Sequence, residues 1–297
     1  MSVLHQIGRV AMRRVPPLRP VVHAWRARRA ASRLGDPAAD PPPVLVYQMG
    51  KVGSSTVARV LRAAAYPDLH VHSLEPETLR RVYEEQRRAG GRFSVGYTWH
   101  LSRAVQARLR CLGDTCRVSV ITLVRDPIAR EVSALFQSPT VQGAALLGAD
   151  GALDAQRAVA SLRARFSKKD ACWWVFDWFQ SEIGATLGVD VMAAPFPRER
   201  GWGIVEGARA SGLVLRTEDL DRTLAPALRA FLGIEVGDVT RHRSNVRSET
   251  RDAARYGDVL SGVRLPRDAV ERIYAQPFVR HFYPQPMLDA FIARWSE

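Results

Sequence analysis

Short apolar runs separated by amphipathic stretches extend along most of this chain. Residues 44–48 and 118–124 are β-branched apolar runs, the pattern of strands that are buried on both faces. Three further runs, at residues 69–72, 93–97 and 212–216, also predict strands. Because the strands alternate with helical segments, the sequence predicts a three-layer α/β fold, in which helices cover both faces of a mostly parallel central sheet. We expect the strands at 44–48 and 118–124 to be parallel neighbours.

Helical spacing of apolar residues fills the regions between these strands. Residues 75–89 predict a polar helix, residues 220–232 predict another, and the chain from residue 249 onward is helical with proline breaks. Residues 152–188 also predict helices, and they carry a cluster of bulky aromatic residues: Trp173, Trp174, Phe176, Trp178 and Phe179. We expect this cluster to belong to the hydrophobic core rather than to bind a ligand.

Three consecutive prolines at residues 41–43 separate the start of the chain from the rest, since proline stops a helix and favours extended backbone. We therefore predict a basic N-terminal arm, residues 1–40, and one folded domain, residues 41–297. Before its first acidic residue the arm carries eight arginines: Arg9, Arg13, Arg14, Arg19, Arg26, Arg28, Arg29 and Arg33. Such an arm can be a solvated tail, a helix packed on the domain, or a peripheral contact with an anionic membrane.

The formal net charge of +13 favours a polyanionic partner. It is not accompanied by a zinc pattern, a homeodomain-like helix or an aromatic RNA-binding signature, so we expect no specific nucleic-acid partner. A highly charged nucleotide and an acidic polysaccharide fit the charge equally well. Cys111, Cys116 and Cys172 lack disulfide or zinc spacing and are expected to be reduced thiols. With no secretory signal and no apolar run of about 18 to 20 residues, we expect a cytoplasmic protein.

The strongest candidate for chemistry follows the first predicted strand. A loop leads from this strand into a helix, with the residues Gly50, Lys51, Val52, Gly53, Ser54, Ser55 and Thr56. Its glycines let backbone N–H groups turn inward, and the helix N-terminus and Lys51 add positive charge, so the loop suits a phosphate-like anion. The chain has only two other lysines, Lys168 and Lys169, among 43 basic residues, which favours a specific role for Lys51. The alternative is a strand-to-helix turn without chemistry.

A second candidate anion site follows the strand at 118–124. Arg125 stands at the carboxyl end of this strand, where α/β sheets bind ligands. Ser133 lies eight positions later, in a helix predicted to begin at Pro127. A guanidinium and a hydroxyl together can clamp a dianionic phosphate. In the structural alternative, Arg125 pairs with Asp126 and Ser133 is buried against a helix.

These motifs together resemble the sulfotransferases that use 3′-phosphoadenylyl sulfate (PAPS). Residues 51–56 resemble the family's loop for the donor's 5′-phosphosulfate, and residues 125–133 resemble the motif in which an Arg and a Ser bind its 3′-phosphate. Residues 215–220 are similar to the family's strand–Glu-Asp-Leu passage. His281-Phe-Tyr283 and the terminal helix with Trp295 are similar to a bacterial branch described as capsular polysaccharide synthesis proteins. The first loop departs from the family, because it reads Gln-Met-Gly-Lys-Val-Gly where many relatives have a Pro-Lys-Ser-Gly type of turn. It also lacks the Gly-Lys-Ser/Thr ending of a Walker A loop, which points away from ordinary ATP and GTP hydrolysis.

The resemblance covers residues 43 to 295 and implies a P-loop NTPase-like sulfotransferase fold. It implies transfer of the sulfuryl group of PAPS to a hydroxyl of a carbohydrate or glycolipid, with release of adenosine 3′,5′-bisphosphate (PAP). The donor would be bound by Lys51, Val52, Gly53, Ser54, Ser55, Thr56, Arg125 and Ser133. Lys51 and His100 would act in catalysis, since His100 lies where relatives carry their base at the end of the third predicted strand. His72 is the reserve candidate, and the late arginines Arg241, Arg243 and Arg247 are candidates to close over the donor.

Two other classes of protein fit part of the sequence. A small-molecule or nucleotide kinase would share the sheet and the loop but would need a magnesium-binding carboxylate, for which Asp126 is the obvious candidate. A polyanion-binding protein without catalysis would explain the charge and the arm. No set of acidic ligands indicates a metal site, so we expect no metal.

Overall fold

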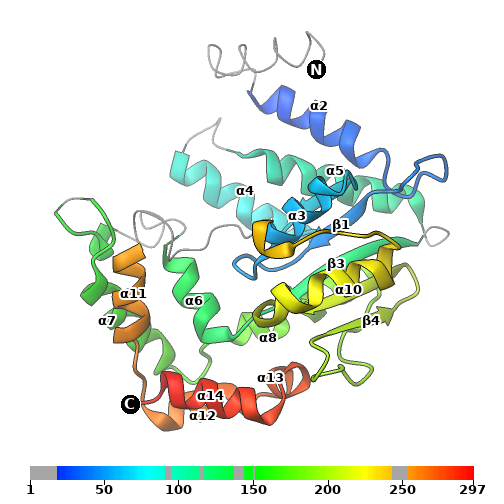
Figure 1. Ribbon diagram of the computed structural model, residues 1–297. Coiled ribbons are helices and arrows are strands. Elements are labelled where there is room, and N and C mark those ends of the chain that lie inside the picture. The colour runs from blue at the N-terminus through cyan, green and yellow to red at the C-terminus, as the bar shows by residue number, and fades with distance from the viewer. Residues whose placement is uncertain (1–18, 91–94, 114–116, 137–143, 150, 243–252) are drawn as a thin grey trace.

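The computed structural model describes residues 19–90, 95–113, 117–136, 144–149, 151–242 and 253–297. At its centre lies a five-stranded sheet in the order β2-β1-β3-β5-β4 (Figure 1). The strands are β1 (Val44–Tyr47), β2 (Asp68–Val71), β3 (Val118–Val124), β4 (Trp202–Glu206) and β5 (Ala210–Arg216). The first three and β5 are parallel, whereas β4 pairs antiparallel with β5. The prediction that β1 and β3 are parallel neighbours is confirmed, with Leu45 opposite Val120.

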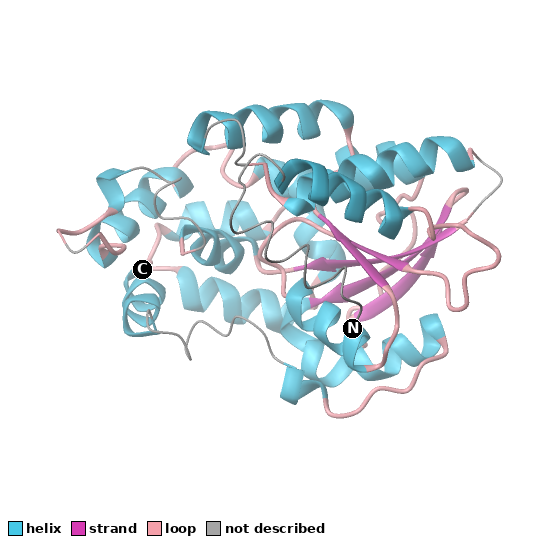
Figure 2. Ribbon diagram, turned by 90° about the horizontal axis from the view of Figure 1, so that it is seen from above, coloured by secondary structure: helices cyan, strands magenta, loops and turns pink. Residues whose placement is uncertain are grey.

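Helices lie on both sides of this sheet (Figure 2). On one side are α3 (Ser54–Ala63) and α10 (Leu220–Leu232), which contact β1 and β5 respectively. On the other side α5 (Tyr97–Leu112) contacts β2, and α4 (Pro76–Gly90) and α2 (Arg19–Ala31) pack against α5. The remaining helices are α6 (Pro127–Leu135), α7 (Ala155–Phe166), α8 (Trp173–Trp178), the π-helix η3 (Phe179–Gly184), α9 (Ala185–Leu187), α11 (Ala253–Gly262), α12 (Arg267–Tyr274), α13 (Pro277–Phe282) and α14 (Gln285–Trp295). The expected α/β class is therefore confirmed.

The order of the strands places a topological switch point beside β1. From β1 the chain passes through α3 to β2 on one side, then through α4 and α5 to β3 on the other side of β1. Where the connections leave in opposite directions, open α/β sheets generally bind ligands at the carboxyl ends of the two strands concerned, here β1 and β3. The loop that begins at Gly50 follows β1, and Arg125 follows β3. Both candidate anion motifs therefore lie at this switch point.

The strand predicted at residues 93–97 is wrong where the structure describes it. Residues 91–94 lie outside the described part, Val95 and Gly96 have no regular structure, and Tyr97 begins α5. The short alternation of apolar and polar residues favoured a strand, but side-chain contacts with neighbouring helices favour a helix here. Trp99 Nε1 donates to the Leu79 carbonyl of α4, and the ring of Tyr97 packs edge-on against His23 of α2.

Part of the basic arm packs on the domain. Residues 19–31 form α2, and its residues Ala27 and Ala31 are buried. The opposite side of α2 leaves Val21 and Trp25 exposed. The boundary at residue 41 stays a prediction, and residues 1–18 lie outside the described part. No helix that the structure describes is long and apolar enough to span a bilayer.

Candidate functional site

The loop after β1 is held in a strained left-handed turn. Lys51 has φ 74°, and Gly53, which precedes α3, has φ 84°. Non-glycine residues with positive φ are uncommon and cluster at functional sites. A Cβ atom on Gly53 would lie 3.0 Å from Leu220 Cδ1 and 3.2 Å from Thr217 Cγ2. Glycine is therefore required at position 53 both by its backbone conformation and by the close approach of α10.

The variant Gly53→Ala is expected to destabilise the protein and distort the loop. A left-handed conformation costs an alanine about 1–2 kcal/mol, and the contacts with Leu220 and Thr217 add to this cost. Thermal unfolding measures the effect. The matched control is Gly257→Ala in α11, where no atom lies within 4 Å of the added Cβ and φ is not positive. This control should be neutral or slightly stabilising. A Gly53→Ala protein as stable as the control would show that position 53 does not require glycine.

Hydrogen bonds tie the loop to the ends of β3 and β5. Arg125 Nη1 donates to the Lys51 carbonyl over 2.9 Å. Thr217, which follows β5, places Oγ1 2.6 Å from the Val52 carbonyl and 2.7 Å from the Val124 carbonyl. The two sequence-predicted anion motifs are thus in direct contact. Thr217 was not among the predicted site residues, although it belongs to the passage that carried the family resemblance.

A polar network joins the loop to the end of β2. The buried side chain of Gln48 lies within hydrogen-bond distance of Ser54 Oγ in the loop, and of His70 and His72 in β2 and just after it. His72 Nδ1 lies 2.9 Å from Gln48 Nε2, a donor, and 3.2 Å from the Gln48 backbone carbonyl, an acceptor. Each tautomer of the ring therefore has a partner, and Nε2 is the basic nitrogen in the tautomer whose Nδ1–H donates to the carbonyl. The protein atoms around the ring partly desolvate it, and this effect, with the charges of Lys51 and Arg130, lowers the pKa of His72 despite the hydrogen bond with Gln48. Part of the residue remains accessible to solvent. An exposed histidine with a shifted pKa is typical of a recessed functional site.

A second arginine, which the sequence analysis gave no role, also contacts the loop. Arg130 of α6 donates through Nε to the Gly50 carbonyl over 3.0 Å. Its guanidinium lies 4.1 Å from the centre of the Trp174 ring, a cation–π distance. Behind it, the fully buried carboxylate of Glu131 pairs with both Arg130 and Arg165. The guanidinium is therefore held in place on three sides.

Asp126 has a structural role. It caps α6 by accepting from Ile128 N, and it also accepts from Tyr274 Oη over 2.6 Å and from Trp295 Nε1 over 2.8 Å. The side chain is buried, so these donors replace water and tie α6 to the C-terminal helices. The expected alternative pairing of Arg125 with Asp126 is absent from the described ion pairs. Ser133 is buried in the same helix, and no described contact joins it to Arg125.

Glu218, after β5, is a further carboxylate at this edge. Its oxygens accept from the Asp126 N–H over 2.8 Å and from Tyr283 Oη over 3.1 Å. Burial, together with the charge of Asp126, raises the pKa of Glu218 to about 7, although the residue remains exposed to solvent. Glu218 and His72 thus combine solvent access with shifted pKa values.

His100 lies in different surroundings from those expected. It stands in the first turn of α5 rather than at the end of a strand, with its ring 5.9 Å from that of His23 and 5.1 Å from that of Trp99. Burial and the neighbouring His23 lower the pKa of His100. No described contact joins it to residues 50–56. The assignment of His100 as the base stays a prediction, but among the described residues His72 is the histidine that adjoins the loop.

The late arginines and the cysteines singled out in the sequence have no described hydrogen bond or ion pair with the loop at residues 50–56. Arg241 is exposed beside Asp238, whereas Arg243 and Arg247 lie outside the described residues. Cys111 and Cys172 are free thiols, as expected, and Cys116 is not described. Within the described ranges, no three His, Cys, Asp or Glu side chains are grouped so that they could hold a metal ion.

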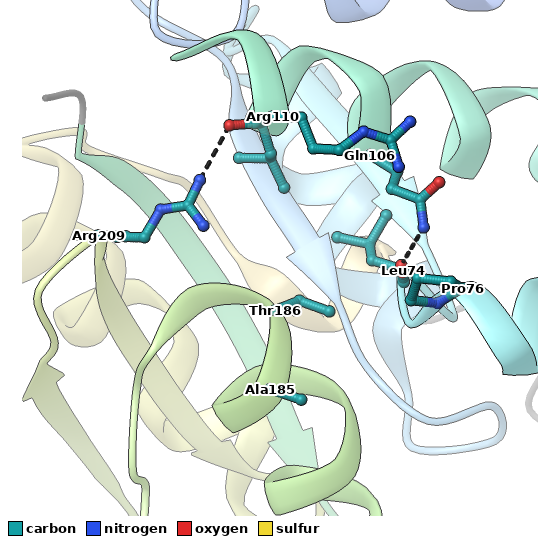
Figure 3. A pocket seen from close by; sticks show the side chains of 8 residues that line it. Leu74, Pro76, Gln106, Arg110, Ala185, Thr186 and Arg209 are labelled. Atoms are coloured by element: carbon teal, nitrogen blue, oxygen red, sulfur yellow. Dashed lines mark hydrogen bonds between the residues drawn. The ribbon is translucent and has the colours of Figure 1, made fainter. Parts of the chain in front are cut away.

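A cavity of about 170 Å³ lies apart from the loop, between α5 and α9 (Figure 3). Its walls include Gln106, Arg209 and Thr186. Gln106 Nε2 donates to the Leu74 carbonyl, and Arg209 Nη2 donates to the Leu109 carbonyl. None of the lining residues belongs to the loop at 50–56.

Comparison with known proteins gives one family. Residues 150–284, less than half of the chain, match the model of a family described as "Putative capsular polysaccharide synthesis protein". Searches of curated proteins and of solved structures find no match. The match is consistent with a role related to polysaccharides.

Proposed function

We propose that this protein is a sulfotransferase that transfers the sulfuryl group of PAPS to a hydroxyl of a carbohydrate or glycolipid and releases PAP. One observation carries the proposal: the hydrogen bond from Arg125 Nη1 to the Lys51 carbonyl. It joins two cationic motifs from neighbouring strands at the switch point of the sheet, where an anionic nucleotide is expected to bind. The family match supports the carbohydrate part of the proposal.

The donor would lie across the carboxyl ends of β1 and β3. Lys51 and the N–H groups of residues 52–56 would hold the 5′-phosphosulfate, since a helix N-terminus favours an anion. Arg125 and the hydroxyl of Ser133 would hold the 3′-phosphate, which requires the buried Ser133 to become accessible from this edge of the sheet. The residues of the loop therefore fit the phosphosulfate better than Ser133 fits the 3′-phosphate.

The chemistry follows from these positions. The acceptor oxygen forms a bond to sulfur while the bond from sulfur to the phosphate oxygen breaks. The acceptor's proton passes to Nε2 of His72, and the charge that develops on the departing phosphate oxygen is stabilised by Lys51 and the loop N–H groups. As in phosphoryl transfer, positioning and electrostatic stabilisation supply most of the rate.

The contacts of Asp126 favour this proposal over a kinase. A magnesium-dependent kinase needs a carboxylate whose oxygens face the nucleotide. Both oxygens of Asp126 already accept hydrogen bonds from protein donors, and the side chain is buried. Thermal shift with PAP and with ATP plus Mg²⁺ tests the choice. We expect PAP to raise the melting temperature and ATP plus Mg²⁺ to have little effect; the reverse order would favour the kinase.

The variant Arg125→Ala is expected to bind PAP about ten- to more than a hundredfold more weakly, because it loses a charge-assisted hydrogen bond worth ~1.5–3 kcal/mol. The loss of its bond to the Lys51 carbonyl should also loosen the loop. Calorimetry with PAP measures the change. The exposed Arg28→Ala on α2 serves as the control for the loss of one positive charge. Equal affinities in the two variants would refute the placement of the nucleotide.

A further inference from the structure

The aromatic cluster of residues 173–179 is divided between the core and the surface. Trp178 and Phe179 are buried, as the sequence predicts, and Trp178 packs edge-on against Tyr47 of β1. Trp173, at the start of α8, is 59% exposed. Trp174 is partly buried beneath the guanidinium of Arg130. The expectation that the whole cluster is core is therefore wrong for Trp173.

Two of the three lysines of the chain precede this exposed ring. Lys168 and Lys169 lie in the turn between α7 and α8, and both are exposed. Backbone hydrogen bonds from Ala171 N to the Lys168 carbonyl and from Trp173 N to the Asp170 carbonyl fix the turn. Asp170 is the one acidic residue in it, so the turn is positive. Neither lysine belongs to a described ion pair.

A chain of contacts leads from the residue after Trp173 to the loop at the switch point. Trp174 follows Trp173, and the guanidinium of Arg130 lies over the Trp174 ring. Arg130 in turn donates a hydrogen bond to the Gly50 carbonyl in the loop. Lys51 and Arg130 both lower the pKa of His72, so these groups lie close to the histidine that adjoins the loop. A chain lying over Trp173 and Trp174 would thus approach the loop where Arg130 contacts it.

We propose that Trp173, Lys168 and Lys169 form the binding surface for an acidic oligosaccharide, the acceptor of the proposed sulfuryl transfer. This inference rests on the proposed function. The C–H face of a sugar ring packs on an exposed indole, which offers a large apolar area. Carboxylate or sulfate groups on the neighbouring sugars would pair with the two ammonium groups, whose long stems suit a flexible polyanion.

The binding surface can be tested without the donor. The probes are a hyaluronan octasaccharide and an octamer of sialic acid, both carboxylate-bearing, with maltooctaose as the neutral comparison. We expect the wild type to prefer the acidic probes. Trp173→Ala should bind them about tenfold more weakly, and Lys168→Gln/Lys169→Gln should bind them more weakly with a smaller salt dependence.

Helix α2 supplies matched controls. Trp25 is also 59% exposed and lies beside Arg28 and Arg29, with the Arg29 guanidinium 5.7 Å from its ring. Trp25→Ala and Arg28→Gln/Arg29→Gln therefore remove the same ring and the same two charges elsewhere, and both should bind the acidic probes as the wild type does. Each variant is checked by thermal unfolding.

Three results would overturn the inference: no binding of either acidic probe, unchanged affinity in Trp173→Ala, or equal losses in the α2 variants. PAP binding is measured on the same samples. A protein that binds the acidic probes through Trp173 but does not bind PAP would refute the sulfotransferase proposal alone. A protein that binds PAP normally but fails any of the three tests would refute the binding surface alone.

Discussion

Replacing His72 with alanine is expected to lower turnover by about 10²- to 10⁴-fold while leaving PAP affinity close to that of the wild type. The ring accepts the acceptor's proton in the proposed reaction, so its loss affects the chemical step rather than donor binding. Contacts of His72 Nδ1 with Gln48 orient the ring, and Nε2 is the available base in the tautomer whose Nδ1–H donates to the Gln48 carbonyl. Steady-state rates of sulfate transfer, with PAP calorimetry on the same preparation, separate the two effects.

The comparison with His100→Ala decides between the two histidines. His100 was expected as the base from its place in the sequence, but in the structure it packs against His23 and Trp99. We expect His100→Ala to keep most of the turnover. If instead His100→Ala is inactive and His72→Ala is active, the sequence-based assignment is correct and the one made from the geometry is wrong.

The pH dependence of the rate gives an independent check on His72. A general base must be neutral, and burial with Lys51 and Arg130 holds the pKa of His72 below its usual value of ~6.5. Activity should therefore be constant near neutrality and fall only as the pH drops through this lowered pKa. An acid limb with a midpoint above ~6.5 would contradict the assignment.

Replacing Lys51 with methionine is expected to damage both donor binding and turnover. The ammonium group is the only lysine charge at the loop, and it would neutralise the bridging and departing oxygens of the donor. Loss of one such stabilising group costs about 10²- to 10³-fold in turnover. Methionine keeps the length of the side chain, so the change removes charge more than bulk.

Two further variants serve as comparisons for Lys51→Met. Lys51→Arg keeps the charge but brings a broader, planar group into the turn, and it should recover binding better than turnover. Lys168→Met removes a lysine from the exposed turn before α8 and should leave PAP affinity unchanged. PAP affinity that falls equally in Lys51→Met and Lys168→Met would indicate general charge attraction instead of a built donor site.

The centre of the sheet could be predicted from sequence because β1, β3 and β5 are mainly apolar. All four residues of β1 are buried, and such runs have few alternatives to a sheet covered on both faces. The edge strand β4 was missed: Trp202–Glu206 contains a glycine, ends in an acid and is partly exposed, so its pairing depends on β5. The start of α5 was predicted as a strand because its local pattern is short. Contacts with α2 and α4 decide its conformation.

The candidate site was predictable only where the backbone defines it. The residues 50–56 and Arg125 follow from strand ends and glycine positions, and the structure joins them. Gln48, Arg130 and Thr217 act through side chains that cross between elements, and no local pattern indicates which loop carbonyl such a side chain will reach. The same limit applies to His100, since its contact with His23 depends on how α5 packs against α2.

The most direct test of the central claim is transfer of labelled sulfate. The protein is incubated with PAPS labelled at sulfur and, in parallel, with ATP labelled at the γ-phosphate plus Mg²⁺, using a panel of acidic and neutral glycans and glycolipids. The account predicts that label from PAPS enters a carbohydrate acceptor with the wild type and is lost with Lys51→Met. Label that arrives only from ATP, or a wild type that neither binds PAP nor transfers sulfate to any acceptor, would contradict it.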